Sequence, residues 1–358
     1  MARSPAGAAA IVTVIDRTER EADIAGFLNR AGWGAAERGL LAGDASFRRY
    51  DRLRLDSQTA VLMDAPPPME NVGPFINVAR LLAGLGFSAP RILAEDRDRG
   101  LLLLEDLGDD TYTSLLRQGY DERALYELAT DALIEVRRRA PVAALKTLPA
   151  FDDARCLREV SLLLDWYWPA IKGAPAPDAA RAGFEAAWRA TLPGMWKAGR
   201  TVTLFDFHVD NLLVLPGRSG FQACGLLDFQ DAVAGPTPFD LASLLEDVRR
   251  QVPRDLASAM VDRYLKGNPD LAAEDFRSGF AISAAQRNTR IAGTFTRLLK
   301  RDNKPSYQRF MPRVWELLQQ DIAHPALAAI KEWFELHLPT AERRPVIDLN
   351  SQVQELGS

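Results

Sequence analysis

One segment near the middle of the chain restricts the fold more than any other. Residues 201–230 read TVTLFDFHVDNLLVLPGRSGFQACGLLDFQ, in which three apolar runs are separated by polar residues and by a Pro-Gly turn. We expect TVTLF to be extended and NLLVL to form a hairpin with QACGLL, because short apolar runs around a Gly/Pro turn favour paired strands. Amphipathic helical patterns lie on both sides, so this β-structure sits within a mainly helical domain.

Three polar residues of this segment stand at the ends of the expected strands. Asp206 precedes Asn211 by five residues, and Asp228 follows the hairpin. A catalytic loop for phosphoryl transfer has the same step from its Asp to its Asn, and a metal-binding Asp follows on the next loop. Asp206 is therefore a candidate base, and Asn211 and Asp228 are candidate Mg²⁺ ligands. Each residue alone is more typical of a turn or cap, but the combined spacing favours the site.

The neighbouring polar residues have roles that the pattern leaves open. His208 either steadies the loop by a hydrogen bond or contacts a substrate. The run Thr-Pro-Phe-Asp that ends at Asp240 has the signature of a helix start. A capping box explains Asp240 at least as well as a catalytic role, so we interpret it as structural support. Asp231 is close to the expected metal ligand and stays undecided.

The composition is that of a globular protein that needs neither nucleic acid nor a membrane. The 358 residues are 47% hydrophobic and 26% charged, with a net charge of −4, so two domains and no overall basic field are expected. No apolar run reaches the roughly 18–20 residues of a membrane span, and the first residues do not form a convincing signal peptide. Cys156 and Cys224 lie in apolar surroundings, which favours a reduced, cytoplasmic protein.

The periodicity predicts a small first domain over residues 1–107, a helical domain over 108–345 and a loose tail over 346–358. In the first domain we expect a small sheet with a helix packed across it, from a helical pattern at 21–41, strands at 47–55 and 59–63, a helix at 75–85, and strands at 91–94 and 101–104. In the second domain the amphipathic patterns predict helices at 121–139, 151–167, 178–198, 238–250, 255–266 and 274–301.

Several stretches together resemble the aminoglycoside-phosphotransferase/choline-kinase superfamily. They are FDFHVDNLLVL, GLLDFQDAVAGPTPFDLASLLEDVRR, GDASFRRYDRL, LLLLEDLGD and RNTRIAGTFTRLLKRDNKPSYQRFMPRVWELL, which span about residues 43–338. Within the superfamily they look most like the bacterial anomeric sugar kinases that phosphorylate N-acetylmuramate and N-acetylglucosamine in cell-wall recycling. The resemblance implies an α+β, protein-kinase-like bilobal fold, with a small antiparallel sheet plus helix in the N-lobe and a larger, mainly helical C-lobe.

The same resemblance implies a site for ATP and Mg²⁺. Asp206 carries over as the catalytic base, and Asn211 and Asp228 carry over as the metal ligands. A nucleotide-covering loop would include Ser46, Phe47, Arg48 and Arg49. The hinge would fall on residues 105–107, where the backbone of Glu105 and Leu107 would meet adenine.

Two departures from the family pattern concern the phosphates. The loop begins Leu-Phe-Asp rather than His-Gly-Asp or His-Arg-Asp, so it lacks one scaffold hydrogen bond. The lysine that such kinases carry on the third strand should fall near Met63, and its glutamate partner near Asn77, yet both are absent. Arg48 or Arg49 is our candidate for the replacement cation, although either is also typical of a solvated strand face.

The acceptor side is less marked in the sequence. Asp165 and Trp166 belong to an aromatic-rich stretch on which a sugar ring would stack, although Trp at helical spacing is more often core. Gln286 and Arg290 share a helical stripe that would read sugar hydroxyls or a carboxylate, and a salt-bridged surface explains them equally well. No dense acidic run of the kind that a polycationic aminoglycoside requires is evident beyond Glu246-Asp247.

These features predict a monomeric, cytoplasmic small-molecule kinase that uses ATP and Mg²⁺. We expect an amino sugar as acceptor, phosphorylated at the anomeric hydroxyl of N-acetylmuramate or N-acetylglucosamine in peptidoglycan recycling. The alternatives are a kinase for another hydroxyl compound, such as choline, homoserine or an aminoglycoside, and a pseudokinase that binds a nucleotide without turnover.

Overall fold

The computed structural model describes residues 17–43 and 47–346, which fall into two compact units. The first unit contains the described residues up to Ile76 and Pro90–Asp106, and the second contains Asn77–Ala89 and the described residues from Leu107 on. The chain therefore passes between the units at three places. Ser46, the N-terminal segment that we tested for a signal peptide and residues 347–358 of the expected tail lie outside the described residues.

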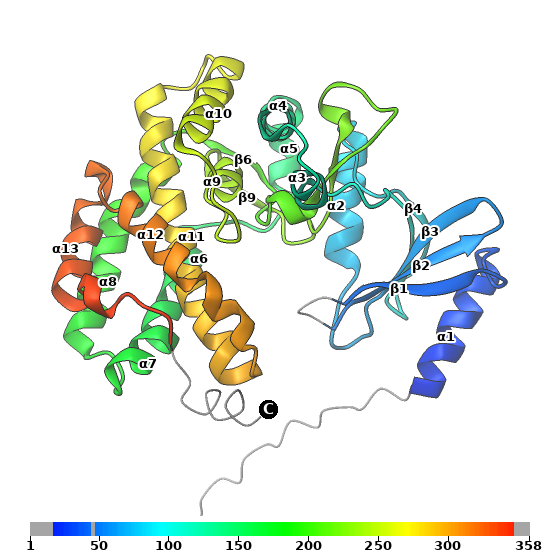
Figure 1. The fold of residues 1–358 in the computed structure, drawn as a ribbon, viewed down its shortest axis with the longest axis horizontal. Helices are drawn as coiled ribbons and strands as arrows, with labels where there is room; N and C mark the ends of the chain where they lie inside the picture. Colours follow the sequence, from blue (N-terminus) through cyan, green and yellow to red (C-terminus); the bar gives the residue numbers. More distant parts are fainter. Residues whose placement is uncertain (1–16, 44–46, 347–358) are drawn as a thin grey trace, which may run out of the picture. The chain divides into compact units, whose positions relative to one another are not determined.

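A five-stranded antiparallel sheet forms the frame of the first unit (Figure 1). Its strand order is β1-β2-β3-β5-β4, with the bounds β1 Glu37–Gly43, β2 Arg49–Leu55, β3 Gln58–Asp64, β4 Ile92–Asp96 and β5 Leu101–Glu105. The helical pattern expected over 21–41 is wrong at its end, because α1 (Arg17–Arg30) stops before a left-handed Gly32 with φ 81°. The residues that follow form β1 instead.

Helix α1 packs on one face of this sheet. Ile24, Phe27 and Leu28 of α1 form a buried cluster with apolar side chains of β2, β3 and β5. Burying a large aliphatic or aromatic side chain contributes about 1.5–3 kcal/mol, so these contacts hold the helix on the sheet. The helix that we expected across the sheet, at 75–85, is α2 (Gly73–Gly84), most of which belongs to the second unit.

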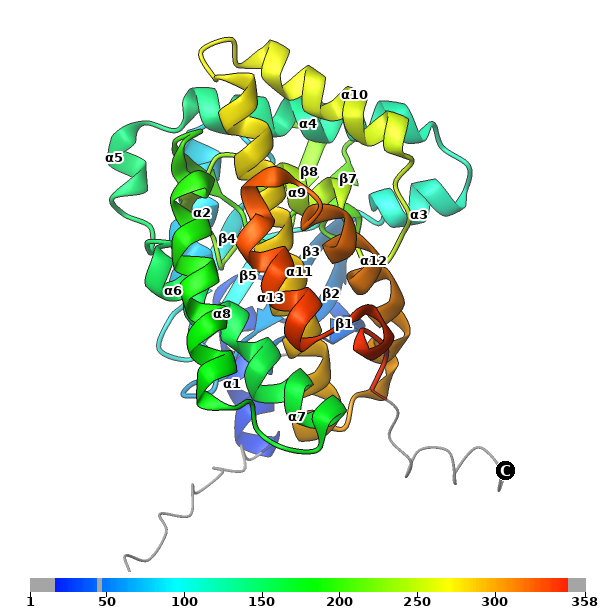
Figure 2. The ribbon, with the colours of Figure 1, turned by 90° about the vertical axis from the view of Figure 1, so that its left-hand side faces the viewer.

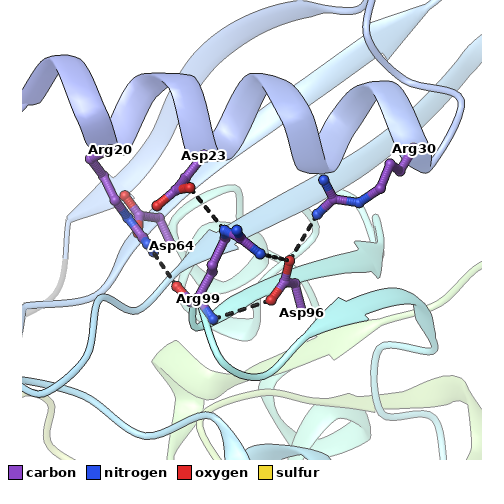
Figure 3. Close-up of polar contacts among 6 residues, drawn as sticks. All are labelled: Arg20, Asp23, Arg30, Asp64, Asp96 and Arg99. Atoms are coloured by element: carbon purple, nitrogen blue, oxygen red, sulfur yellow. Dashed lines mark hydrogen bonds and ion pairs between the residues drawn. The ribbon is translucent and has the colours of Figure 1, made fainter.

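Ion pairs fasten α1 to the same sheet at the ends of two of its strands (Figure 3). Arg20 bonds to Asp64 at the end of β3, with Nη2 2.5 Å from Oδ1, and to the backbone oxygen of Arg99. The Arg99 guanidinium in turn bridges Asp23 of α1 and Asp96 of β4, with N–O distances of 2.8 and 3.3 Å. Because the partners come from three elements, the network fixes the position of α1 along the sheet.

The second unit is mainly helical, as predicted (Figures 1 and 2). Beside most of α2, its helices are α3 Tyr112–Arg117, α4 Glu122–Arg139, α5 Val142–Leu145, α6 Asp153–Leu162, α7 Trp168–Lys172, α8 Asp178–Thr191, α9 Phe239–Leu245, α10 Arg254–Gly267, α11 Ala273–Asp302, α12 Met311–Asp321 and α13 Ala328–His337. The long α11 contacts α6, α9 and α12 and so organises the core of this unit. None of the described helices is long and apolar enough to cross a membrane.

Some helices end earlier than the periodicity predicts. The helix expected over 151–167 becomes a π-helical turn at Leu163–Tyr167. Gly293 of α11 lies against its start, and a Cβ there would be 2.3 Å from the Leu162 carbonyl carbon. The helix expected over 238–250 ends at Leu245, and the one over 178–198 continues after Thr191 only as a 3₁₀ turn.

Two small β-ladders in the second unit contain the strands of the segment 201–230. The predicted hairpin is confirmed, since β7 (Leu212–Val214) pairs with β8 (Cys224–Leu226). The run TVTLF contributes β6 (Arg200–Thr203), which pairs antiparallel with β9 (Val233–Pro236). Asp206 and Asp228 therefore leave two different ladders.

Replacing Gly100 with alanine should destabilise the first unit strongly. Gly100 has φ 64°, and an added Cβ would lie 2.0 Å from the backbone oxygen of Ala65, the residue after β3. A left-handed residue with a Cβ costs about 1–2 kcal/mol, and the clash adds to that cost. Urea unfolding of Gly100→Ala should show a larger loss than Gly119→Ala, because Gly119 has φ 83° with no atom within 4 Å of its Cβ position. Equal losses would contradict the clash.

Candidate active site

The loop that carries Asp206 is held by a buried carboxylate from another element. Asp240, at the start of α9, accepts hydrogen bonds from the backbone N–H of Leu204 and of Phe205, at 2.5 and 2.9 Å. We predicted Asp240 as structural support, and the structure gives it that role by a different contact. The capping-box interpretation is wrong, since no side-chain cap is present at the N-terminus of α9.

Burial changes the acidity of this support. Asp240 is 4% exposed, and removal from water raises the pKa of its carboxyl to about 7. The two backbone N–H groups lower the pKa and the nearby charge of Asp206 raises it, but both effects are smaller than that of burial. The Asp240 carboxyl thus stabilises the loop through its two hydrogen bonds, although its removal from water costs solvation free energy.

Phe205 places Asp206 by adopting an unusual backbone conformation. Its φ is 77°, in the left-handed region that residues with a Cβ rarely occupy. The ring stacks on Phe239, with centroids 5.3 Å apart and an interplanar angle of 9°. The guanidinium of Arg290 lies 4.4 Å from the ring centroid and that of Arg155 lies 4.9 Å from it. These ring contacts stabilise Phe205 in its strained backbone conformation, and Phe205 directly precedes the expected base, Asp206.

Asn211 joins the two parts of the predicted site. Its Nδ2 donates to the backbone oxygen of Asp206 at 2.9 Å and lies 3.4 Å from Oδ2 of Asp228. The backbone adds a second link, because the N–H of Leu227 donates to the backbone oxygen of Asn211 at 2.9 Å. Asp228 is itself left-handed, with φ 54°, and its Oδ1 accepts from Gln230 Nε2 at 2.7 Å. The three predicted residues are therefore together, half-buried, on one side of the loop.

The oxygen atoms of this group suit Mg²⁺. A half-buried Asp228 carboxylate and an Asn211 amide oxygen are hard ligands, and Mg²⁺ takes one or two carboxylates with phosphates and water completing its shell. The amide nitrogen of Asn211 donates to the backbone oxygen of Asp206, so the amide oxygen of Asn211 points away from that backbone oxygen. Among the described residues no group of three or more His, Cys, Asp or Glu side chains forms an all-protein metal centre.

His208 supports this arrangement as a neutral ring. It is 6% exposed, and burial, together with the charges of Arg249 and Arg287, lowers the pKa of His208 well below its usual range. Its Nε2 lies 3.3 Å from Nδ2 of Asn211, within hydrogen-bond distance of the amide that joins the site. Of the two predicted roles, the contact favours loop support. Asp231, left undecided, is exposed.

The residues predicted for the acceptor divide into two groups. Gln286 and Arg290 of α11 both meet Glu159 of α6, at 3.1 and 4.0 Å, and Arg290 also covers Phe205. Asp165 instead pairs with Arg181 of α8 at 2.8 Å, beside a half-buried Trp166. Glu159 was not among the predicted residues, because its only signal in the sequence is an acidic residue on an amphipathic helix.

Of the described residues predicted for the nucleotide, most belong to the first unit and only Leu107 belongs to the second. Phe47 is 63% exposed, Arg48 pairs with Glu70, and Arg49 pairs with Asp51. Glu105 ends β5 and bonds to Arg91 at 3.1 Å, whereas Leu107 is the first residue after the last passage into the second unit. Met63, where a lysine was expected, is 1% exposed in the core.

The fold and the loop define a phosphotransferase of the kinase-like class. Solved structures with this fold include a choline/ethanolamine kinase family protein from Mesorhizobium loti, with a TM-score of 0.61 and 14% identity over 88% of this chain and 99% of that chain. Another is the GDP complex of aminoglycoside 2′-phosphotransferase-IIIa, with a TM-score of 0.58 and 13% identity over 85% and 98%. The predicted α+β, kinase-like fold class is confirmed.

Residues 38–277 match the phosphotransferase enzyme family, and the chain belongs to this family. Its relatives include a protein of Caulobacter vibrioides named N-acetylmuramate/N-acetylglucosamine kinase, 37% identical over 91% of this chain and 99% of the relative. A Pseudomonas aeruginosa protein of the same name is 36% identical over 84% and 89%. The resemblance stated from the sequence is confirmed, and the chain is a small-molecule kinase.

Substituting Asp240 should change how stability depends on pH. The folded-state pKa of about 7 exceeds the unfolded value of about 3.9, so the folded protein holds a proton that the unfolded chain releases in this window. The free energy of unfolding therefore falls as pH rises from about 4 to 7, by up to about 1.4 kcal/mol per unit for this group. Asp240→Asn should lack that slope in urea unfolding measured across this range. The exposed Asp178→Asn should retain it, and parallel curves for all three proteins would refute the shift.

Proposed function

We propose that this enzyme transfers the γ-phosphoryl group of ATP, with Mg²⁺, to the anomeric hydroxyl of N-acetylmuramate or N-acetylglucosamine. The observation that carries the proposal is the Asn211 side chain, which ties the Asp206 backbone to the Asp228 carboxylate. The names of the relatives support the acceptor. We also propose that the enzyme is cytoplasmic and acts in peptidoglycan recycling.

In this mechanism each loop residue has one task. The Asp206 carboxylate orients the acceptor hydroxyl and takes its proton as the oxygen attacks phosphorus. Asn211 and Asp228 would hold Mg²⁺, which when bound neutralises charge on the phosphate oxygens. His208 keeps the Asn211 amide in place, and Asp240 keeps the loop in the conformation that presents Asp206.

The surroundings of Phe205 favour this acceptor over a polycationic one. Arg155 and Arg290 both lie over the ring that precedes Asp206. Glu159 pairs with both guanidinium groups and neutralises one of the two charges, and the positive charge that remains disfavours an aminoglycoside or choline relative to a neutral or anionic sugar. Gln286 is fully buried and donates to Glu159, so of the two predicted residues Arg290, which is partly exposed, offers hydrogen-bond donors for hydroxyl, acetamido or carboxylate groups.

Asp206→Asn should abolish most turnover while nucleotide binding survives. Removing a general base costs about 10²–10⁴-fold in kcat. The measurement is ADP release with N-acetylglucosamine and N-acetylmuramate, run beside choline, homoserine and kanamycin. The exposed Asp178→Asn serves as the matched control and should keep the rate of the unmodified enzyme. Turnover of neither sugar would overturn the acceptor, turnover of no acceptor would favour a pseudokinase, and an unchanged rate in Asp206→Asn would remove it as base.

Asp228→Asn should raise the Mg²⁺ requirement. The substitution keeps the shape of the side chain but removes the charged ligand, and even an outer partner of a metal ligand is worth about 10–100-fold in metal affinity. We expect the Mg²⁺ concentration for half-maximal ADP release to rise by roughly tenfold or more, and EDTA to stop the unmodified enzyme. A Mg²⁺ titration identical to that of the unmodified enzyme would exclude Asp228 as a ligand.

A further inference from the structure

One carboxylate lies between the two guanidinium groups that cover the Phe205 ring. Glu159 of α6 accepts from Nε of Arg155, one turn earlier on the same helix, through Oε1 at 2.9 Å. Its other oxygen, Oε2, accepts from Nε2 of Gln286 at 3.1 Å. The Nε of Arg290 lies 4.0 Å from the same Oε2, which is beyond hydrogen-bond distance. The cluster therefore contains two positive charges and one negative charge.

Arg290 carries the positive charge that the cluster leaves unpaired. Within residues 17–43 and 47–346, the contacts of its guanidinium are the long ion pair with Glu159 and the face of the Phe205 ring. The Arg290 side chain is 17% exposed, whereas that of Gln286 is fully buried. Because a guanidinium has five N–H donors, Arg290 has hydrogen-bonding capacity for a ligand that its protein contacts do not use.

This unpaired charge lies beside the expected base. The Arg290 guanidinium is 4.4 Å from the centroid of the Phe205 ring, and Phe205 directly precedes Asp206. Since consecutive Cα atoms are about 3.8 Å apart, a sugar held at Asp206 is within reach of the guanidinium. Arg287 on the same helix reports both charges, because burial lowers the pKa of Arg287 to about 10 and the charges of Arg290 and Asp206 also act on it. All these residues belong to the second unit.

The two proposed acceptors differ in one group that a cation can recognise. N-acetylmuramate carries a lactyl ether, which ends in a carboxylate, where N-acetylglucosamine has a hydroxyl. Both sugars offer the same anomeric hydroxyl, so a residue that distinguishes them must meet the lactyl group. A guanidinium matches the planar carboxylate with two parallel N–H donors, and such charge-assisted bonds are roughly twice as strong as neutral ones.

We propose that Arg290 is the specificity-determining residue of the acceptor site, where it binds the carboxylate of an anionic amino sugar, and that the charge of Glu159 limits this preference. The inference rests on the proposed function, because it requires an amino sugar held at Asp206. Arg155 donates to Glu159 and stays paired, so the surplus charge falls on Arg290. The site thus accepts both sugars and favours the one that carries a carboxylate.

The selectivity between the two sugars measures the role of Arg290. It is the ratio of kcat/KM for N-acetylmuramate to kcat/KM for N-acetylglucosamine, from ADP release at saturating Mg-ATP. Arg290→Gln should lower this ratio about tenfold or more, since one charge-assisted pair is lost, and Arg290→Lys should recover part of it. If Arg290 only supports Phe205, both sugars will slow alike and the unchanged ratio will overturn the proposal. Arg277→Gln is the matched control, because Arg277 pairs with Asp262 about 20 Å earlier along α11, at about 1.5 Å per residue.

Glu159→Gln should change the same ratio in the opposite direction. The substitution keeps the size of the side chain but removes the negative charge that opposes a sugar carboxylate, so we expect the ratio to rise roughly threefold or more. A ratio that falls or stays the same would show that the Glu159 charge does not limit the preference, and would overturn this part of the proposal.

The outcomes distinguish this inference from the proposed function. If neither sugar is phosphorylated and neither binds in calorimetric titration, the proposed function fails and the inference fails with it. If both sugars are phosphorylated and Arg290→Gln leaves the ratio unchanged, or if only N-acetylglucosamine is a substrate, the inference alone is overturned. If the sugars bind without turnover, the proposed function fails, and the ratio of their dissociation constants tests Arg290 by the same criterion.

Discussion

The two hydrogen bonds that the Asp240 carboxylate accepts from the Leu204 and Phe205 N–H groups are the constraint on which the site depends. They hold Phe205 in a left-handed conformation, and that conformation sets where Asp206 stands. Asn211 then connects the Asp206 backbone with Asp228, so the geometry of all three residues follows from one buried acid. Burying the Asp240 carboxyl costs solvation free energy, and the same burial raises its pKa. The apolar packing of Phe205 on Phe239 offsets part of that cost.

Much of this arrangement could be predicted from local sequence, and the rest depends on distant contacts. The β7–β8 hairpin and the spacing from Asp206 to Asp228 are local patterns, which short windows reveal. The pairing of β6 with β9 joins short strands that are far apart in sequence. The sequence of β9, VAGP, contains a Gly and a Pro, which are not typical of a strand. The capping-box interpretation of Asp240 is wrong because its hydrogen-bond partners lie 35 and 36 residues earlier. Spacing alone carries no information about such bonds.

The first unit shows the same division between local and distant information. Alternation predicted β2 and β3, but the end of α1 and the start of β1 depend on a left-handed glycine that helical periodicity does not register. The absent lysine was visible in the sequence, whereas the face on which Arg49 lies follows only from the β2–β3 register. Glu70 stands in a proline-rich stretch without periodicity, and only its contacts distinguish it from a surface residue.

The assignment of Asn77–Ala89 to the helical unit has a consequence for dividing the chain into fragments. A cut after Asp106 would separate this segment from Gln222, whose backbone oxygen accepts from the Ser88 hydroxyl at 2.6 Å, and from Phe221, whose ring lies 5.0 Å from that of Phe87. Neither fragment would then be a complete folding unit, since one would carry buried side chains whose partners are in the other. Mixing the two fragments should restore what either lacks, so the enzyme is suited to complementation between halves rather than to dissection into independent domains.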